Sequence, residues 1–200
     1  MSEALTPSVV AAQVAVGRLL SHLLLREIDA PLLGELRASE LSATLRELGV
    51  DVPPFESADV DGIWLEERGA EYLDRWLRPE RGGPPVQSLW SGGQYEGEPA
   101  VALRRWAKAV GLHYDAAAAC GAPIDHLGSC VALWCLAAEH SAEHAEVLRI
   151  QHLKWGRRPL AAAQAAGGFY GGVAGAALGW LDWIADSVGG EGTQDCDPVC

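Results

Sequence analysis

The sequence predicts an all-α fold, built as a single helical domain of roughly eight to ten helices. Apolar residues recur at spacings of three and four, which place them on one face of a helix. No run alternates apolar and polar residues, and β-branched residues are scarce beside Ala and Leu, so strands are not expected. At 200 residues, with 49% hydrophobic and 21% charged, the chain can bury one substantial core.

The first helices are marked by their start signals. Thr6-Pro7 is a cap followed by a proline, and it predicts a helix that reaches about residue 28. Pro31 opens a short helix, and Ser39 caps the next. A longer helix is predicted over residues 59–78, with Gly69 as the expected point of any interruption. We expect this helix to bury its large apolar residues, namely Val60, Ile63, Trp64, Leu73, Trp76 and Leu77.

The second half of the chain begins with a loop. Residues 79–97 lack periodicity and are rich in Gly and Pro, and a loop of this length is often functional. Pro99 then starts a helix to about residue 110. Three more helices are predicted, over about 123–138, 139–153 and 169–188. Residues 1–188 are therefore expected to form one helical domain, followed by an acidic, disordered tail over 189–200.

The segment from Ala122 to Leu127 has the most informative sequence. Pro123 suits the first helical position, where a missing N–H costs nothing, and Asp125 suits the positive end of the helix dipole. His126 lies beside that acid, where it can serve as a core imidazole, order the loop or contact a ligand. A well-made helix start and a binding site are both consistent with this pattern.

Pro-x-Asp-His-Leu at 123–127 resembles the signature of the TorD/DmsD (NarJ-like) family, cytoplasmic chaperones of molybdenum-containing oxidoreductases. Other segments resemble the family in the same order, and together they span roughly residues 60 to 185. They are the loop Pro84–Trp90 with Gly93–Glu98, the His-x-x-Trp at His152–Trp155, and Phe169-Tyr170. The chain departs from the family at Val86, where some members carry an aromatic residue.

The resemblance implies a cytoplasmic, system-specific chaperone that is not an enzyme and holds no cofactor of its own. It would bind the twin-arginine signal peptide of a molybdopterin oxidoreductase catalytic subunit, aid cofactor insertion and prevent premature export. The chain would be a monomer or a helix-swapped homodimer. The implied peptide-binding residues come from two facing segments and one preceding helix: Pro123, Asp125 and His126; Pro85, Ser88 and Trp90; and Tyr72 and Trp76.

The charge of the chain excludes one class of partner. A formal net charge of −12 argues against nucleic acid, because neutralising phosphates needs a basic face. Residues 51–80 carry nine acids against three arginines, a net of −6. An acidic surface beside apolar grooves would suit a basic, hydrophobic peptide, but negative charge also serves solubility alone.

An enzymatic alternative rests on His140-x-x-Glu143-His144. Two histidines four apart on a helix share a face and can bind zinc, with the glutamate as general base, which would make the chain a small zinc-dependent hydrolase. A third ligand would have to come from Asp182 or Asp186. The charged surroundings resemble a solvated helix face, and the sequence contains no nucleophile–base set, so we expect a binding protein.

Three remaining patterns are predicted to be structural or to lie in the tail. Residues 165–181 carry no charge and contain G-x-x-x-G spacings, which we expect to serve helix packing rather than stable membrane insertion. Arg157-Arg158 lies too far along the chain for an export signal and is expected in a turn between helices. Cys196 and Cys200 are a metal or redox pair, or part of a frayed terminus.

Overall fold

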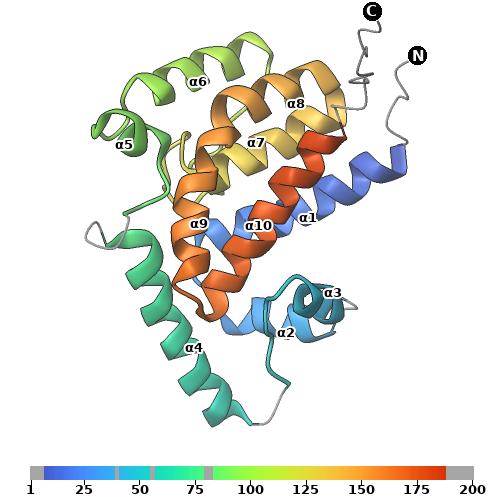
Figure 1. The fold of residues 1–200 in the computed structure, drawn as a ribbon, viewed down its shortest axis with the longest axis vertical. Coiled ribbons are helices and arrows are strands. Elements are labelled where there is room, and N and C mark those ends of the chain that lie inside the picture. Colours follow the sequence, from blue (N-terminus) through green and yellow to red (C-terminus); the bar gives the residue numbers. More distant parts are fainter. Residues whose placement is uncertain (1–6, 39–40, 55–56, 79–82, 188–200) are drawn as a thin grey trace, which may run out of the picture.

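The computed structural model describes residues 7–38, 41–54, 57–78 and 83–187 (Figure 1). Its described part is all-helical, which confirms the predicted fold class, and its only β-type pairing is a bridge between Val86 and His126. The α-helices are α1 (Pro7–Leu25), α2 (Ala30–Ala38), α3 (Leu41–Glu47), α4 (Ala58–Tyr72), α5 (Gln87–Gly92), α6 (Glu98–Ala109), α7 (Leu127–His140), α8 (Ala142–Leu148), α9 (Arg157–Ala165) and α10 (Gly168–Asp186). The π-helical turn η1 (Leu73–Leu77) extends α4. A second π-helical turn, η3 (Arg149–Leu153), and the 3-10 turn η4 (Lys154–Gly156) join α8 to α9.

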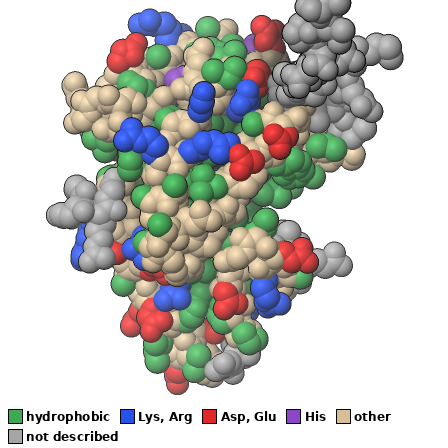
Figure 2. Space-filling model, in the orientation of Figure 1, with side chains coloured by type: hydrophobic (Ala, Val, Ile, Leu, Met, Phe, Trp, Pro, Cys, Tyr) green, Lys and Arg blue, Asp and Glu red, His purple; other side chains and the backbone are tan. Residues whose placement is uncertain are grey.

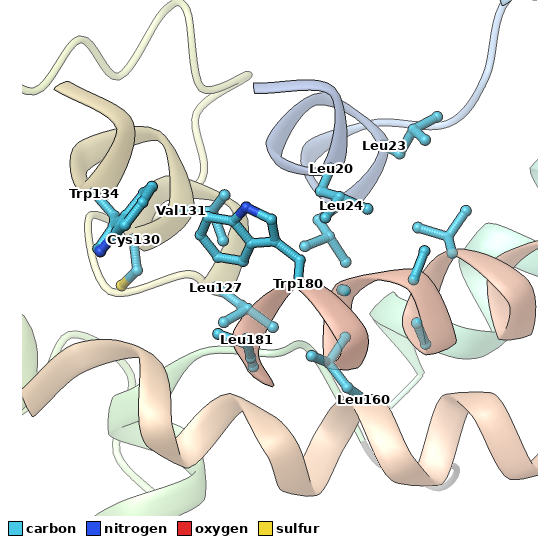
Figure 3. Packing of buried hydrophobic residues seen from close by; sticks show 14 of the residues in the cluster. Leu20, Leu23, Leu24, Leu127, Cys130, Val131, Trp134, Leu160, Trp180 and Leu181 are labelled. Carbon is cyan, nitrogen blue, oxygen red and sulfur yellow. The ribbon is translucent and has the colours of Figure 1, made fainter. Parts of the chain in front are cut away.

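The core lies where α1, α7 and α10 pack together, with α9 alongside α10 (Figure 1). Trp180 of α10 meets Trp134 of α7 edge to face, with ring centroids 5.0 Å apart (Figure 3). The indole N–H of Trp180 donates to the backbone oxygen of Gln13 at 2.9 Å, so the ring is fixed by both neighbouring helices. Burying these large rings supplies much of the hydrophobic stabilisation of the domain.

The glycines of α10 serve close helix packing. A Cβ on Gly172 would lie 2.2 Å from the backbone oxygen of Gly49, just beyond α3. One on Gly171 would lie 3.2 Å from the backbone oxygen of Ala163 in α9, and one on Gly175 would meet the Gln164 side chain at 2.8 Å. The G-x-x-x-G spacing therefore lets two other segments approach α10 within the chain itself.

One helix of the described residues is long and apolar enough to cross a membrane by length and composition. It is α1, over Ser8–Leu25. This test is also passed by core helices, and Leu20, Leu23 and Leu24 of α1 are buried in the core (Figure 3). The charge-free stretch in α10, considered above as a span, does not meet the same criterion.

Several element boundaries differ from those predicted. The helix expected from Pro123 begins instead at Leu127, because His126 is extended and acts as its N-cap. The loop at 79–97 contains the short helix α5. Ser141 divides the helix expected over 139–153, and the two arginines expected in a turn open α9. The predicted tail over 189–200, with Cys196 and Cys200, lies outside the described residues, as does the Ser39 cap.

The prediction for the outer side of α4 and η1 was wrong. Val60, Ile63, Leu73 and Leu77 were expected inside, but they are 45%, 61%, 48% and 48% exposed. The expected interruption at Gly69 does not occur, and the helix continues to Tyr72. This element lies at the edge of the molecule, where it packs mainly against α10 (Figure 1), so only one of its sides has a neighbour to pack against.

Candidate functional site

Asp125 and Ser88 form the centre of the predicted site. Both the backbone N–H and the hydroxyl of Ser88 donate to Oδ2 of Asp125, at 2.9 and 2.5 Å. Asp125 is fully buried, and its Oδ1 accepts no hydrogen bond from the described residues. The structure thus brings together the two motif segments that the sequence paired, and their contact is sealed in the interior.

Backbone hydrogen bonds reinforce this contact between the segments. The N–H of Gln87 donates to the carbonyl of Asp125 at 2.9 Å, and the N–H of Leu127 donates to the carbonyl of Pro85 at 2.8 Å. These two bonds flank the antiparallel bridge between Val86 and His126, next to the Ser88–Asp125 contact. We call the set of Pro85, Gln87, Ser88, Asp125 and His126 the loop junction.

The third motif segment joins the loop junction through a glutamine. Gln87 accepts from Nδ1 of His152 at 2.9 Å and donates to the backbone oxygen of Gln151 at 2.8 Å. Because that amide donates through its nitrogen, its oxygen must accept, which fixes His152 as the Nδ1–H tautomer. Burial lowers the pKa of His152, although the nearby carboxylate of Asp125 acts in the opposite direction. Three segments that are distant in sequence thus converge at one buried place.

His126 has a structural role at the start of α7. Its Nδ1 accepts from the N–H of Gly128 at 3.1 Å, so the imidazole caps a helix that has no acid in its first turn. The ring is 6% exposed, and burial lowers its pKa to about 4. His126 is therefore neutral near pH 7, and Pro123 beside it is buried too.

Trp90 is the one predicted site residue that remains partly accessible. Its indole N–H donates to the backbone oxygen of Pro84 at 3.1 Å, and the guanidinium of the exposed Arg158 lies 5.6 Å from the ring centroid. The ring is thus held by its own loop and covered on one side by a cation. The charge of Arg158 would repel the arginines of a twin-arginine peptide, so the surface around Trp90 does not favour its binding.

Tyr72 and Trp76 lie in a separate cluster and not at the loop junction. Tyr72 is buried, donates to the backbone oxygen of Leu24 at 3.2 Å, and packs against Tyr170 with centroids 5.2 Å apart. Trp76 is 1% exposed. The carboxylate of Glu71 accepts from the N–H groups of Phe169 and Tyr170, at 3.3 and 2.7 Å, and so caps α10. These aromatics anchor α4 and η1 to the body of the protein.

The opposite side of α4 and η1 is a surface that combines apolar and acidic side chains, visible at the lower left of Figure 2. We call it the α4 face, and it consists of Asp59, Val60, Ile63, Glu66, Glu67, Leu73 and Leu77. Glu67 is the acid of this face that contacts a cation of the described part of the chain, Arg68 at 3.3 Å. The helix is held from behind by the Arg37–Asp61 ion pair, at 2.6 Å, which belongs to its inner side.

Sequence reasoning missed the α4 face because it assigned Val60, Ile63, Leu73 and Leu77 to the core. A signal was available, since Ile63 lies one turn from the two acids Glu66 and Glu67. The prediction treated Trp76 and Leu77 alike, as buried residues, whereas Trp76 is buried and Leu77 is exposed.

The histidine motif of the hydrolase alternative is split between two helices. His140 ends α7, Ser141 adopts an extended conformation and caps the next helix, and His144 lies in α8. His144 packs against the ring of Trp106, with centroids 6.0 Å apart. No group of three metal-ligating side chains suited to a metal ion occurs within the described residues. The shared helical face that motivated the zinc hypothesis is therefore not formed.

The cysteines of the described region are free thiols. Cys130 and Cys135 are buried, and burial raises the pKa of both, that of Cys135 to about 12. Both are therefore protonated near neutral pH and act as small apolar groups. Cys120 is exposed.

No protein-family model, curated protein or solved structure matches this chain, so the resemblance to the chaperone family rests on the sequence motifs described above.

Proposed function

We propose that this protein is a cytoplasmic chaperone that binds the twin-arginine signal peptide of a molybdopterin oxidoreductase catalytic subunit. The proposal starts from the four motif segments that resemble the TorD/DmsD family. The chaperone would hold the catalytic subunit until cofactor insertion is complete and so delay the export of that subunit.

The observation that carries the proposal is the chemistry of the α4 face. A signal peptide combines a cationic segment with an apolar stretch of about 7–15 residues. Ala58–Leu77 comprises 20 residues, roughly 30 Å at the helical rise, so it is long enough to lie along that whole stretch. Val60, Ile63, Leu73 and Leu77 would cover the apolar stretch, while the acids of the face would meet the arginines.

In this proposal the loop junction supports the fold and does not touch the peptide. Asp125 and Ser88 are 0% and 1% exposed, so a peptide could reach them only if the loop opened. The proposed binding surface is therefore the α4 face, which contains none of the family-like motifs, and not the set of residues that the family resemblance implies.

The test is calorimetric titration of the full chain with a synthetic twin-arginine signal peptide. Ile63→Ser together with Leu73→Ser should weaken binding at least tenfold, because two apolar contacts are lost. The matched control is Val101→Ser with Ile150→Ser, which removes two apolar side chains of similar exposure from α6 and η3. The control should bind as the wild type does.

Charge is tested with Asp59→Asn and Glu66→Gln, against the exposed Glu143→Gln in α8 as control. The pair should weaken binding several-fold at low salt and much less at high salt, because exposed charges are screened. A peptide with both arginines replaced by glutamine should lose this dependence. Unchanged affinity in both the apolar and the acidic variants would exclude the α4 face as the binding surface.

A further inference from the structure

A cavity of about 300 Å³ opens between α1, the loop over residues 113–120 and α7. No residue of the α4 face and no residue of the loop junction lines this cavity. Its volume is at the lower end of the roughly 300–1,000 Å³ typical of small-molecule sites. The cavity is thus large enough for a small ligand but not for a folded partner.

The inner wall of the cavity is apolar and its polar groups are already paired. Leu25, Leu133 and Leu136 contribute the larger apolar side chains. The hydroxyl of Ser21 donates to the backbone oxygen of Gly128 at 2.8 Å, and that of Tyr114 donates to the backbone oxygen of Ala122. An apolar ligand body would therefore leave no buried donor or acceptor newly unsatisfied.

Two arginines, Arg18 and Arg26, line the cavity in a chain whose net charge is −12. Arg18 is neutralised by two hydrogen bonds to Glu139, at 2.7 and 2.8 Å. Among the described residues the guanidinium of Arg26 has no acidic hydrogen-bond partner, and it contacts the ring of His22. Burial, followed by the charge of Arg26, lowers the pKa of His22, although Asp29 and Glu35 act in the opposite direction.

Asp115 is the acid among the described residues that line the cavity, and it is not within ion-pair distance of Arg26. The Oδ1 atom of Asp115 accepts from the N–H groups of Ala117 and Ala118, at 2.9 and 3.2 Å, and so holds its own turn. The exposed His113 adds a second group able to donate to an anion. The guanidinium of Arg26 could donate hydrogen bonds to an anionic group of a ligand bound here.

We propose that this cavity binds a small carboxylate with an apolar body, the carboxylate at Arg26 and the body against Leu25, Leu133 and Leu136. The ligand is a monoanion, because only one unpaired guanidinium serves the mouth. This site is independent of the proposed peptide-binding function, and either can fail without the other.

The probe is octanoate, compared with octanol and octylammonium, titrated calorimetrically into the full chain. Octanoate should bind at least tenfold more tightly than octanol, and octylammonium should not bind detectably. Arg26→Gln should weaken octanoate binding about tenfold, through loss of a charged hydrogen bond, and leave octanol unchanged. The matched control is Arg105→Gln, an exposed arginine of α6 outside the cavity, which should change neither.

Cys120 supplies a second readout, because it is exposed and lines the cavity. In a chain with Cys196→Ser and Cys200→Ser it is the accessible thiol, since Cys130 and Cys135 are buried. Saturating octanoate should slow its alkylation by iodoacetamide several-fold, and less so with Arg26→Gln. Equal binding of octanoate and octanol, or alkylation unaffected by octanoate, would overturn the proposal.

Discussion

Ser88 gives both its backbone N–H and its hydroxyl to one oxygen of the fully buried Asp125, at 2.9 and 2.5 Å. This relationship joins the first turn of α5 to the segment before α7, across 37 positions of the sequence. Hydrogen bonds to a buried charge are among the strongest in proteins, and leaving such groups unpaired is costly. Ser88 and Asp125, two of the residues through which the chain resembles a chaperone family, are here part of its internal structure.

Removing that carboxylate should therefore destabilise the fold. Asp125→Ala is expected to lower the free energy of unfolding by about 3 kcal/mol and Ser88→Ala by about 2 kcal/mol, because each leaves buried partners unsatisfied. The double variant should lose less than the sum of the two, since both act on one contact. Urea unfolding followed by circular dichroism measures all three. Asp182→Ala, which breaks the exposed ion pair with Arg157, is the control and should cost under about 1 kcal/mol.

His126 predicts a pH dependence of stability. Its pKa is about 4 in the folded chain and about 6.5 when unfolded, so below pH 6.5 the unfolded chain binds more protons. Its contribution to stability is therefore constant above about pH 6.5 and falls by about 3 kcal/mol as the pH drops to 4. His126→Asn keeps an acceptor suited to the cap but cannot titrate. The difference between the two unfolding profiles should appear only below pH 6.5, and parallel profiles from pH 7 to 4 would contradict this assignment.

Glu71 is expected to stabilise α10 from a distance in sequence. Its two carboxylate oxygens accept from the N–H groups of Tyr170 and Phe169, at the positive end of the helix. Glu71→Ala should cost about 1–2 kcal/mol of unfolding free energy. The neighbouring Glu67, which is 61% exposed, is the matched control, and Glu67→Ala should change the unfolding free energy by less than about 0.5 kcal/mol. Equal losses in the two variants would show that the cap contributes nothing.

Gly172 and Gly179 form a matched pair on one helix. A Cβ on Gly172 would lie 2.2 Å from a backbone oxygen, whereas one on Gly179 would have no atom within 4 Å. Gly172→Ala should therefore lower the melting temperature clearly, because a backbone segment must move. Gly179→Ala should stabilise the protein by about 0.5–1 kcal/mol through helix propensity alone. Thermal unfolding of the two variants distinguishes the packing role of the α10 glycines from a membrane role.

The sequence was a reliable guide to the helices and a less reliable one to which of their residues are buried. Leu127, Val131 and Trp134, spaced by four and three, share one face of α7 and are all buried, as their spacing predicts. Because α7 is central, Ser129 and Leu133 on its other side are buried as well. The pairing of the loop with Asp125 was also anticipated. The same spacing failed for Val60 and Ile63, because periodicity shows which residues share a side but not which side has a neighbour.

The burial of Asp125 could not be read from the sequence for a related reason. A helix start with an acid nearby is usually solvated, and only the long-range contact with Ser88 allows this carboxylate to be enclosed. The break at Ser141 that separates His140 from His144 is a local feature, because Ser141 is extended and its hydroxyl accepts from the N–H of His144 at 3.2 Å. The apolar spacing on which the predicted helix rested does not show such a cap.

Amide hydrogen exchange of the full chain, with and without a twin-arginine signal peptide, tests the central claim most directly. We predict that the peptide slows exchange of amides in Ala58–Leu77, while amides of Gln87–Gly92 and of residues 123–127 exchange as before. Slower exchange over those two segments, with no change in Ala58–Leu77, would contradict the account and return the binding site to the loop junction.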